Sequence, residues 1–169
     1  GDRFVLRRAS PAATLAAGRV IDPAPPRGVS RRRATEDRLA ALAESPGGGD
    51  SWSTARLDLH GVVAGMRSGA VELAADIRAW LDEAIMTAVA ERDDIPQAEL
   101  AQAIGRALRR LVTLPAAATR TALPVFEAID RLVVEGRLAR EGGRIHEPGR
   151  AASGPPPAVV AAMDRLEQA

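Results

Sequence analysis

Residues 123–146, LPVFEAIDRLVVEGRLAREGGRIH, decide the fold of this chain. Apolar side chains recur at helical spacing after Pro124 and predict a helix that buries Phe126, Ile129, Leu132 and Val133. This helix should end at Glu135-Gly136, because glycine readily takes the left-handed conformation that closes a helix. A two-stranded hairpin should follow, with strands at 137–140 and 144–146 around a turn at Glu141-Gly142-Gly143.

A long helix is predicted ahead of this unit. Apolar residues recur at helical spacing from about Val71 to Glu91, and Trp80 is a candidate break that would divide this stretch into two helices. The part that follows Trp80 carries a continuous apolar stripe: Leu81, Ile85, Ala88 and Val89.

Another helix should begin at Pro96, because proline is favoured in a first turn and the preceding Asp93 and Asp94 can cap backbone donors. Pro115 limits its extent, and its apolar stripe is Leu100, Ile104, Leu108 and Leu111. Three helices followed by a hairpin are the order of a winged helix-turn-helix. We therefore expect an α+β fold, mostly α, with one winged helix at residues 80–149.

The remaining segments are divided by stretches rich in proline and glycine. A connector helix from Arg31 to Glu44 is expected within a linker at 25–50, and the turn-forming residues 45–49 should end it. Residues 51–79 form a unit of their own whose apolar pattern is the weakest in the chain. Residues 150–169 combine a linker with the start of a further helix at 159–166.

The first 24 residues predict a β-hairpin. Strands are expected at 3–7 and 14–21, and Asp22-Pro23 with the prolines that follow should end the sheet. A two-stranded hairpin is marginally stable by itself in water. We therefore expect residues 1–24 to be the last strands of a β-barrel whose other strands precede Gly1, and the chain to be a fragment of a longer protein.

Composition narrows the chemistry. All 23 basic residues are arginine, they face 22 acidic residues, and the net charge is +1, so no broad polyanion-binding surface is expected. The chain has no cysteine, no phosphate-binding GxxxxGK loop and no GxSxG nucleophile elbow. His60 and His146 lie in no metal-binding pattern and are expected at the surface. We predict no metal, no cofactor and no catalysis in this chain.

Arginines of the predicted C-terminal hairpin are candidate RNA contacts. Arg137, Arg140 and Arg144 would mark the wing and could reach phosphates. The alternative is that they are solvated strand ends beside Glu141 and Glu147. The preceding helix would face the groove in a DNA complex, but its acidic residues outnumber Arg131 and would repel phosphates: Glu127, Asp130 and Glu135.

The N-terminal hairpin resembles a known family. The resemblance rests on residues 1–7 (GDRFVLR), Ser10-Pro11, Thr14-Leu15, and 18–23 (GRVIDP) with Pro25-Pro26. These stretches resemble the end of the third domain of selenocysteine-specific translation elongation factors, the SelB family. That family has glycines where this chain has Ala16-Ala17.

Two later stretches carry the same resemblance. Residues 123–148 are similar to the end of a winged helix of that family, and residues 59–80 look like a shortened first winged helix. In this interpretation Val71 to Arg78 belong to a wing, whereas the apolar periodicity places them in a helix.

The resemblance implies a binding role in protein synthesis. In that family an N-terminal GTPase domain and two barrels hold GTP, magnesium and selenocysteinyl-tRNA, and C-terminal winged helices bind the selenocysteine-insertion hairpin of the mRNA on the ribosome. This chain would then link the tRNA-holding barrel to the mRNA-binding arm, with Arg7, Arg8 and Ser10 as candidate tRNA contacts. A cytoplasmic monomer that makes no membrane contact is expected, since no apolar run could span a bilayer.

A second interpretation is a winged-helix transcription regulator that reads DNA through the helix after Pro124. It leaves residues 1–26 without an explanation.

Overall fold

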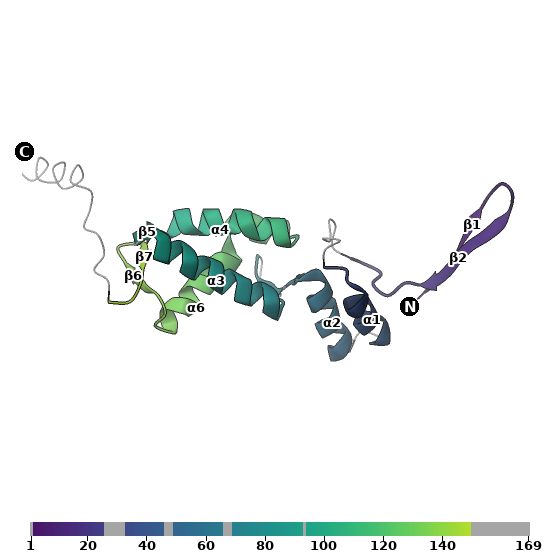
Figure 1. The fold of residues 1–169 in the computed structure, drawn as a ribbon, viewed down its shortest axis with the longest axis horizontal. Helices are drawn as coiled ribbons and strands as arrows, with labels where there is room; N and C mark the ends of the chain where they lie inside the picture. The colour runs from purple at the N-terminus through teal and green to yellow at the C-terminus, as the bar shows by residue number, and fades with distance from the viewer. Residues whose placement is uncertain (1, 26–32, 46–48, 66–68, 93, 150–169) are drawn as a thin grey trace, which may run out of the picture.

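The computed structural model describes residues 2–25, 33–45, 49–65, 69–92 and 94–149. They form an α+β structure that is mostly helical, as expected. Figure 1 shows an elongated arrangement in which the β1–β2 hairpin projects at one end, α1 and α2 lie in the middle, and α3 to β7 form the other end. The predicted segment at 150–169 lies outside the described residues, as do Arg31 and Arg32 of the predicted connector helix.

Strands β1 (Arg3–Arg8) and β2 (Ala13–Arg19) form the predicted antiparallel hairpin, with β2 ending two residues earlier than expected. Gly18 lies opposite Phe4, and a Cβ on Gly18 would come within 2.8 Å of the Phe4 ring, so the ring covers the glycine. Apolar side chains on both faces of the hairpin are exposed: Phe4, Val5, Leu6 and Leu15. Among the described residues, β1 and β2 pair only with each other, so no barrel is seen.

Helices α1 (Glu36–Glu44) and α2 (Asp50–His60) pack together in the middle of the molecule. Helix α1 begins at Glu36 because the Thr35 side chain accepts a hydrogen bond from the backbone N–H of Arg38. Helix α2 ends at Gly61, whose φ of +77° closes the helix through a bond from its N–H to the Leu57 carbonyl.

Strands β3 (Val62–Ala64) and β4 (Val71–Leu73) form a small hairpin directly after α2. The predicted helix from Val71 is therefore wrong over its first turn, because these residues bond to β3 instead. Helix α3 begins at Ala75 and runs unbroken to Arg92, so Trp80 does not divide it and residues 75–78 belong to no wing. The boundary expected between residues 79 and 80 falls inside this helix.

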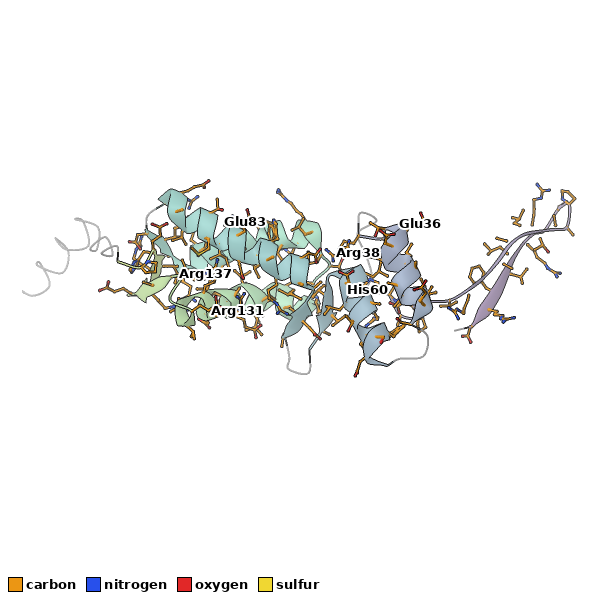
Figure 2. All side chains as sticks on the ribbon, turned by 60° about the horizontal axis from the view of Figure 1, so that its bottom comes forward. Glu36, Arg38, His60, Glu83, Arg131 and Arg137 are labelled. Carbon is orange, nitrogen blue, oxygen red and sulfur yellow. The ribbon has the colours of Figure 1, made fainter. Side chains whose placement is uncertain are left out.

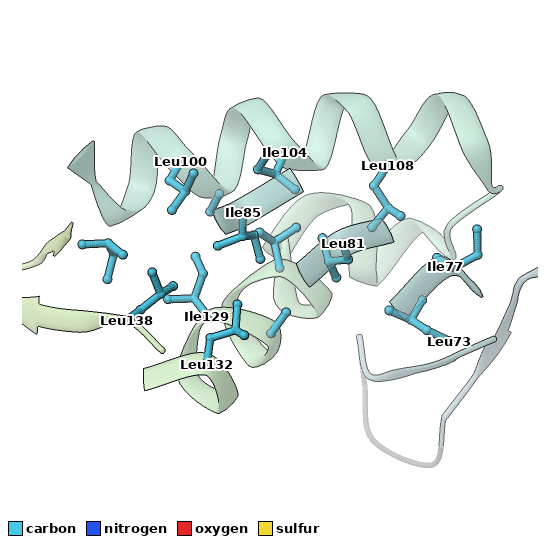
Figure 3. Close-up of a cluster of buried hydrophobic side chains, with 14 of the residues drawn as sticks. Leu73, Ile77, Leu81, Ile85, Leu100, Ile104, Leu108, Ile129, Leu132 and Leu138 are labelled. Atoms are coloured by element: carbon cyan, nitrogen blue, oxygen red, sulfur yellow. The ribbon is translucent and has the colours of Figure 1, made fainter. Parts of the chain in front are cut away.

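The main core lies between α3, α4 (Gln97–Leu111) and α6 (Leu123–Val134). Figure 3 shows these helices meeting through leucine and isoleucine side chains, and Leu81, Leu108, Ile129 and Leu132 are fully buried. Each such side chain contributes about 1.5–3 kcal/mol by leaving water. The stripes predicted on α3 and α4 lie in this core, with Ala88 and Leu111 partly buried at its edge, because residues spaced three and four apart share one face. On α6, Ile129 and Leu132 are buried as predicted, whereas Phe126 and Val133 are only partly buried, and Val125 and Ala128 are buried instead.

A three-stranded sheet of order β5-β7-β6 closes the far end of this core. It consists of β5 (Asp94–Pro96), β6 (Ala139–Glu141) and β7 (Arg144–His146), and its two pairings are antiparallel. The predicted hairpin is present, although its first strand is Ala139–Glu141 and not 137–140. Strand β5 and the short helix α5 (Ala116–Thr121) were not expected. Asp94 is part of β5 and does not cap α4, whose N-cap residue is Pro96.

Candidate functional site

The residues predicted to contact tRNA lie together at the free end of the β1–β2 hairpin. Arg7 and Arg8 occupy the last positions of β1, and Ser10 lies in the turn. All three are exposed, and the Arg8 Nε donates to the Pro11 carbonyl at 3.4 Å. Within the described residues neither arginine has an acidic partner, so both guanidinium groups are available to an anion.

The predicted wing arginines are instead engaged by acidic side chains. Arg137 lies 3.7 Å from Glu135, and Arg140 forms an ion pair with Asp130 on α6. Arg144 donates from Nε to the Asp94 carboxylate at 2.5 Å and from Nη2 to the Asp94 carbonyl at 3.1 Å. Neighbouring acids thus balance the positive charge of the arginines at this hairpin.

Arg131 adds to the same network on α6. It donates to both carboxylate oxygens of Asp82 on α3, at 2.5 and 3.0 Å, and reaches Glu135 at 3.4 Å. The hydrogen bonds to Asp82 raise the pKa of Arg131, an effect that outweighs partial burial. Figure 2 shows Arg131 and Arg137 along the α6 side of the molecule. This ion pair ties α6 to α3 and is a structural contact.

The exit of the hairpin is held on α2 by a set of contacts that we call the exit clamp: Ile21, Asp22 and Ala24 with Trp52, Arg56 and His60. The Asp22 carboxylate, 6% exposed, accepts from His60 Nε2 at 2.7 Å and from Arg56 Nε at 3.0 Å. The exit backbone is also bonded, since Trp52 Nε1 donates to the Ile21 carbonyl at 3.3 Å and Arg56 Nη2 to the Ala24 carbonyl at 3.0 Å.

Three features of α2 make the clamp possible. Trp52, Arg56 and His60 are spaced four residues apart, so they share one face of the helix. The Arg56 guanidinium lies 5.4 Å from the centre of the Trp52 ring, which orients it towards Asp22. His60 is buried, which corrects the expectation that it lies at the surface, and His146 is buried as well.

The clamp favours the charged form of Asp22. Burial raises the pKa of this carboxyl, but the hydrogen bonds from His60, the Ala24 N–H and Arg56 together lower it below its ordinary value. Because an ionised carboxylate can only accept, the His60 Nε2 must carry a proton in this arrangement. The other ring nitrogen, Nδ1, is buried without a partner among the described residues.

A second cluster joins α2 to α3 next to the clamp. Arg33, whose side chain is 9% exposed, donates to both Asp76 carboxylate oxygens at 2.8 and 3.1 Å and to the Asp58 carbonyl at 2.6 Å. Arg38 on α1 reaches the Asp58 and Asp76 carboxylates at 3.3 and 3.2 Å. The hydrogen bonds from Arg33 lower the pKa of Asp76 against the opposing effect of burial.

The two clusters fix the middle of the molecule. Figure 2 shows Arg38 and His60 within the α1–α2 group, between the hairpin and the α3–α6 bundle. The sequence indicated Asp22 as the end of the sheet and as part of the family resemblance, but it did not indicate Arg33, Arg56 or Trp52 as contacts. The spacing of four between Trp52, Arg56 and His60 was a detectable signal, but the partner Asp22 lies 38 residues from His60.

No protein-family model, curated protein or solved structure matches this chain. Among the described residues no group of three or more histidine, cysteine, aspartate or glutamate side chains is placed to hold a metal ion. No helix in the described ranges is both long enough and apolar enough to cross a membrane.

Proposed function

We propose that this chain is a segment of a selenocysteine-specific translation elongation factor, in which it joins the tRNA-holding barrel to the arm that reads the mRNA hairpin. The exit clamp is the observation that carries this proposal. It binds the residues that follow the hairpin to α2 through buried, charge-assisted hydrogen bonds. A connecting segment needs such a joint, because flexible tethering would not fix one binding module relative to the next.

The exposed hairpin supports the barrel part of the proposal. Phe4, Val5, Leu6 and Leu15 are between 41% and 63% exposed, and they lie on a two-stranded sheet with open edges. Contiguous exposed apolar side chains mark an interaction surface. Further strands of a barrel would cover these side chains and complete the sheet.

The α3–β7 unit supports the winged-helix part. Its helices and strands follow the order α3, β5, α4, α6, β6, β7, and the first strand pairs with the last. This is the arrangement that a winged helix would have, with α5 inserted before α6. The α2–β3–β4 segment would be the shortened first winged helix.

The proposed role is binding without chemistry. Selenocysteinyl-tRNA would meet Arg7, Arg8 and Ser10, GTP and magnesium would belong to the preceding GTPase domain, and the mRNA hairpin would bind beyond this chain. The setting would be the ribosome in the cytoplasm, with the factor acting as a monomer. The paired wing arginines and the acidic α6 give a DNA-reading regulator no support.

A read-through assay tests this function. Cells that lack the gene for this protein should lose selenium-dependent read-through of a reporter with an in-frame UGA codon and a selenocysteine-insertion hairpin, and the intact gene should restore it. The reading frame before Gly1 should also encode GTPase motifs. Unchanged read-through, or a start codon directly before Gly1, would overturn the proposal.

A further inference from the structure

A cluster of arginines that have no acidic partner among the described residues lies on α4 and α5 of the α3–β7 unit. Arg106, Arg109 and Arg110 occupy the C-terminal half of α4, and Arg120 lies on α5. All four are exposed, and none of their side chains has a hydrogen bond or ion pair with another described residue. Five other arginines of the same unit each form an ion pair with an acidic side chain: Arg92, Arg131, Arg137, Arg140 and Arg144.

The local sequence makes this cluster unfavourable for the helix itself. Arg106 and Arg110 are four residues apart, where like charges on a helix repel. The positions three and four residues away on α4 carry no acid that could offset the repulsion. The negative end of the α4 dipole favours Arg109 and Arg110 in the last turn, but it does not account for Arg106. A stabilising role therefore does not explain the cluster.

A groove of about 600 Å³ lies beside the cluster. Arg109 from α4 and Arg120 from α5 line it together with Gln102, so donor groups come from two elements. Ala122, which precedes α6, and Phe126 in its first turn also border the groove. Glu99 is the acidic residue of the lining, and its carboxylate is paired with Arg92.

We propose that Arg106, Arg109, Arg110 and Arg120 form a binding surface for the phosphate backbone of an RNA helix. Guanidinium groups bind phosphates in bidentate fashion, and several of them on one surface can neutralise several phosphates of one nucleic-acid backbone. The surface differs from both sites predicted from the sequence, the hairpin end and the wing. The choice of RNA rests on the proposed function, whereas the phosphate chemistry follows from the unpaired arginines.

The test is RNA binding by the full 169-residue chain. The probe is a fluorescein-labelled RNA duplex of about 20 base pairs, followed by anisotropy over a salt titration. Arg109→Gln/Arg110→Gln should weaken binding at least about tenfold at low salt and reduce the salt slope by about 1.8, since each phosphate contact adds about 0.9. Arg106→Gln/Arg120→Gln should act in the same direction.

The matched control removes the same charge from the wing. Arg137→Gln/Arg140→Gln should leave affinity within about twofold, because these arginines are neutralised by Glu135 and Asp130. Arg109→Lys/Arg110→Lys should keep most of the affinity, since the positive charge remains. Circular dichroism of each variant checks that it is folded, which is expected for exposed side chains.

Several outcomes would overturn the proposal. Equal losses in the α4 and wing variants would mean that net charge alone decides binding. A DNA duplex of the same sequence bound as tightly as the RNA would remove the assignment to RNA, and preferential displacement by polyglutamate would indicate an acidic protein partner. If RNA binds through α4 but UGA read-through is unchanged in cells that lack the gene, the RNA-binding surface is supported and only the proposed function is contradicted.

Discussion

At the residue scale, a single glycine allows the α2–α3 junction to form. Gly61 takes a φ of +77° at the end of α2, and a Cβ there would come within 2.8 Å of both Arg33 Nε and Val112 Cγ1. The buried Arg33 guanidinium therefore occupies space that only glycine leaves open. Gly61 therefore caps α2 and also leaves the space in which the Arg33 side chain forms its ion pairs.

Gly61→Ala should destabilise the chain by about 3 kcal/mol, through the left-handed backbone and the overpacked contact together. Gly136→Ala is the matched control, because Gly136 has a φ of +70° and nothing within 4 Å of a built Cβ. It should cost only about 1 kcal/mol. Urea unfolding followed by circular dichroism measures both, and equal losses would contradict the proposed contact with Arg33.

The exit clamp and the cluster of Arg33 with Asp76 should both make stability depend on pH in the acid range. The pKa values of Asp22 and Asp76 lie below the ordinary value of 3.8, so both groups hold fewer protons in the folded chain than in the unfolded chain. Their contribution to the free energy of unfolding is complete above the pKa that they have in the unfolded chain. It is lost as pH falls through the lower pKa that they have in the folded chain. We expect constant stability from these groups between pH 7 and 5 and a decline below about pH 4.

Asp22→Asn separates the clamp from other acid effects. It should lower the free energy of unfolding at pH 7 by about 1–3 kcal/mol, since charge-assisted hydrogen bonds are lost from His60 and Arg56. It should also flatten the decline below pH 4. Asp37→Asn is the control, because Asp37 is exposed on α1 and forms no ion pair among the described residues. A decline as steep in Asp22→Asn as in the unaltered chain would refute the assignment.

At the element scale, the side chain of the buried Arg33 connects α2 to α3. It holds the last turn of α2 through the Asp58 carbonyl and the first turn of α3 through Asp76. Arg38 makes weaker and more exposed contacts to the same two acids. Both arginines belong to one network, but we expect the more buried Arg33 to contribute more to stability than Arg38.

Arg33→Met should destabilise the chain by about 2–3 kcal/mol, because it leaves Asp76 without its closest partner and the Asp58 carbonyl without its donor. Arg38→Met should cost less than about 1 kcal/mol, as expected for an exposed pair. Arg33→Lys should lie between the two, since an ammonium group cannot bind both Asp76 oxygens in the bidentate geometry. Thermal and urea unfolding measure the order, and a larger loss for Arg38→Met would reverse the argument.

Elements with strong local periodicity could be predicted from the sequence, and elements defined by distant partners could not. The stripes of α3, α4 and α6 are spaced as the core requires, so these helices and the hairpin after them were expected. Val71 continues the spacing of Ile77 and Leu81 and was placed in a helix, although its backbone pairs with Ala64. Asp94 was interpreted as a cap for the same reason, because its partner Arg144 lies 50 residues away.

The residues of the candidate site divide in the same way, into those that local sequence patterns indicate and those that depend on distant partners. The hairpin that carries Arg7 and Arg8 could be predicted from the strand pattern, whereas the choice of these residues as candidate contacts came from the resemblance to a known family. The buried His60 and Arg33 could not, because their burial depends on Asp22 and Asp76, which are brought near only by the tertiary fold. The C-terminal hairpin that carries Arg140 and Arg144 was expected, but the acids that pair with these two arginines come from α6 and β5.

At the scale of the whole molecule, the exit clamp decides whether the hairpin keeps a defined orientation. Figure 1 shows the hairpin extending away from the helices, so its orientation depends on the residues around Asp22. The Arg19 Nη2 also donates to the Ala43 carbonyl of α1 at 2.6 Å, which adds one contact near the base of the hairpin. A joint built from buried, charged hydrogen bonds is directional, and removal of one partner leaves the others unpaired.

We predict that the hairpin and α2 hold a narrow range of distances that Asp22→Ala broadens. The chain has no cysteine, so Ala16→Cys and Ser51→Cys place spin labels at two exposed positions, one on β2 and one on α2. Pulsed electron paramagnetic resonance should give one narrow distance distribution in this background and a broad one after Asp22→Ala. Asp37→Ala should leave the distribution narrow, because that carboxylate lies on α1 outside the clamp. A distribution that is already broad with the clamp intact would show that the hairpin moves freely, and a connecting segment of that kind could not transmit orientation from one binding module to the next.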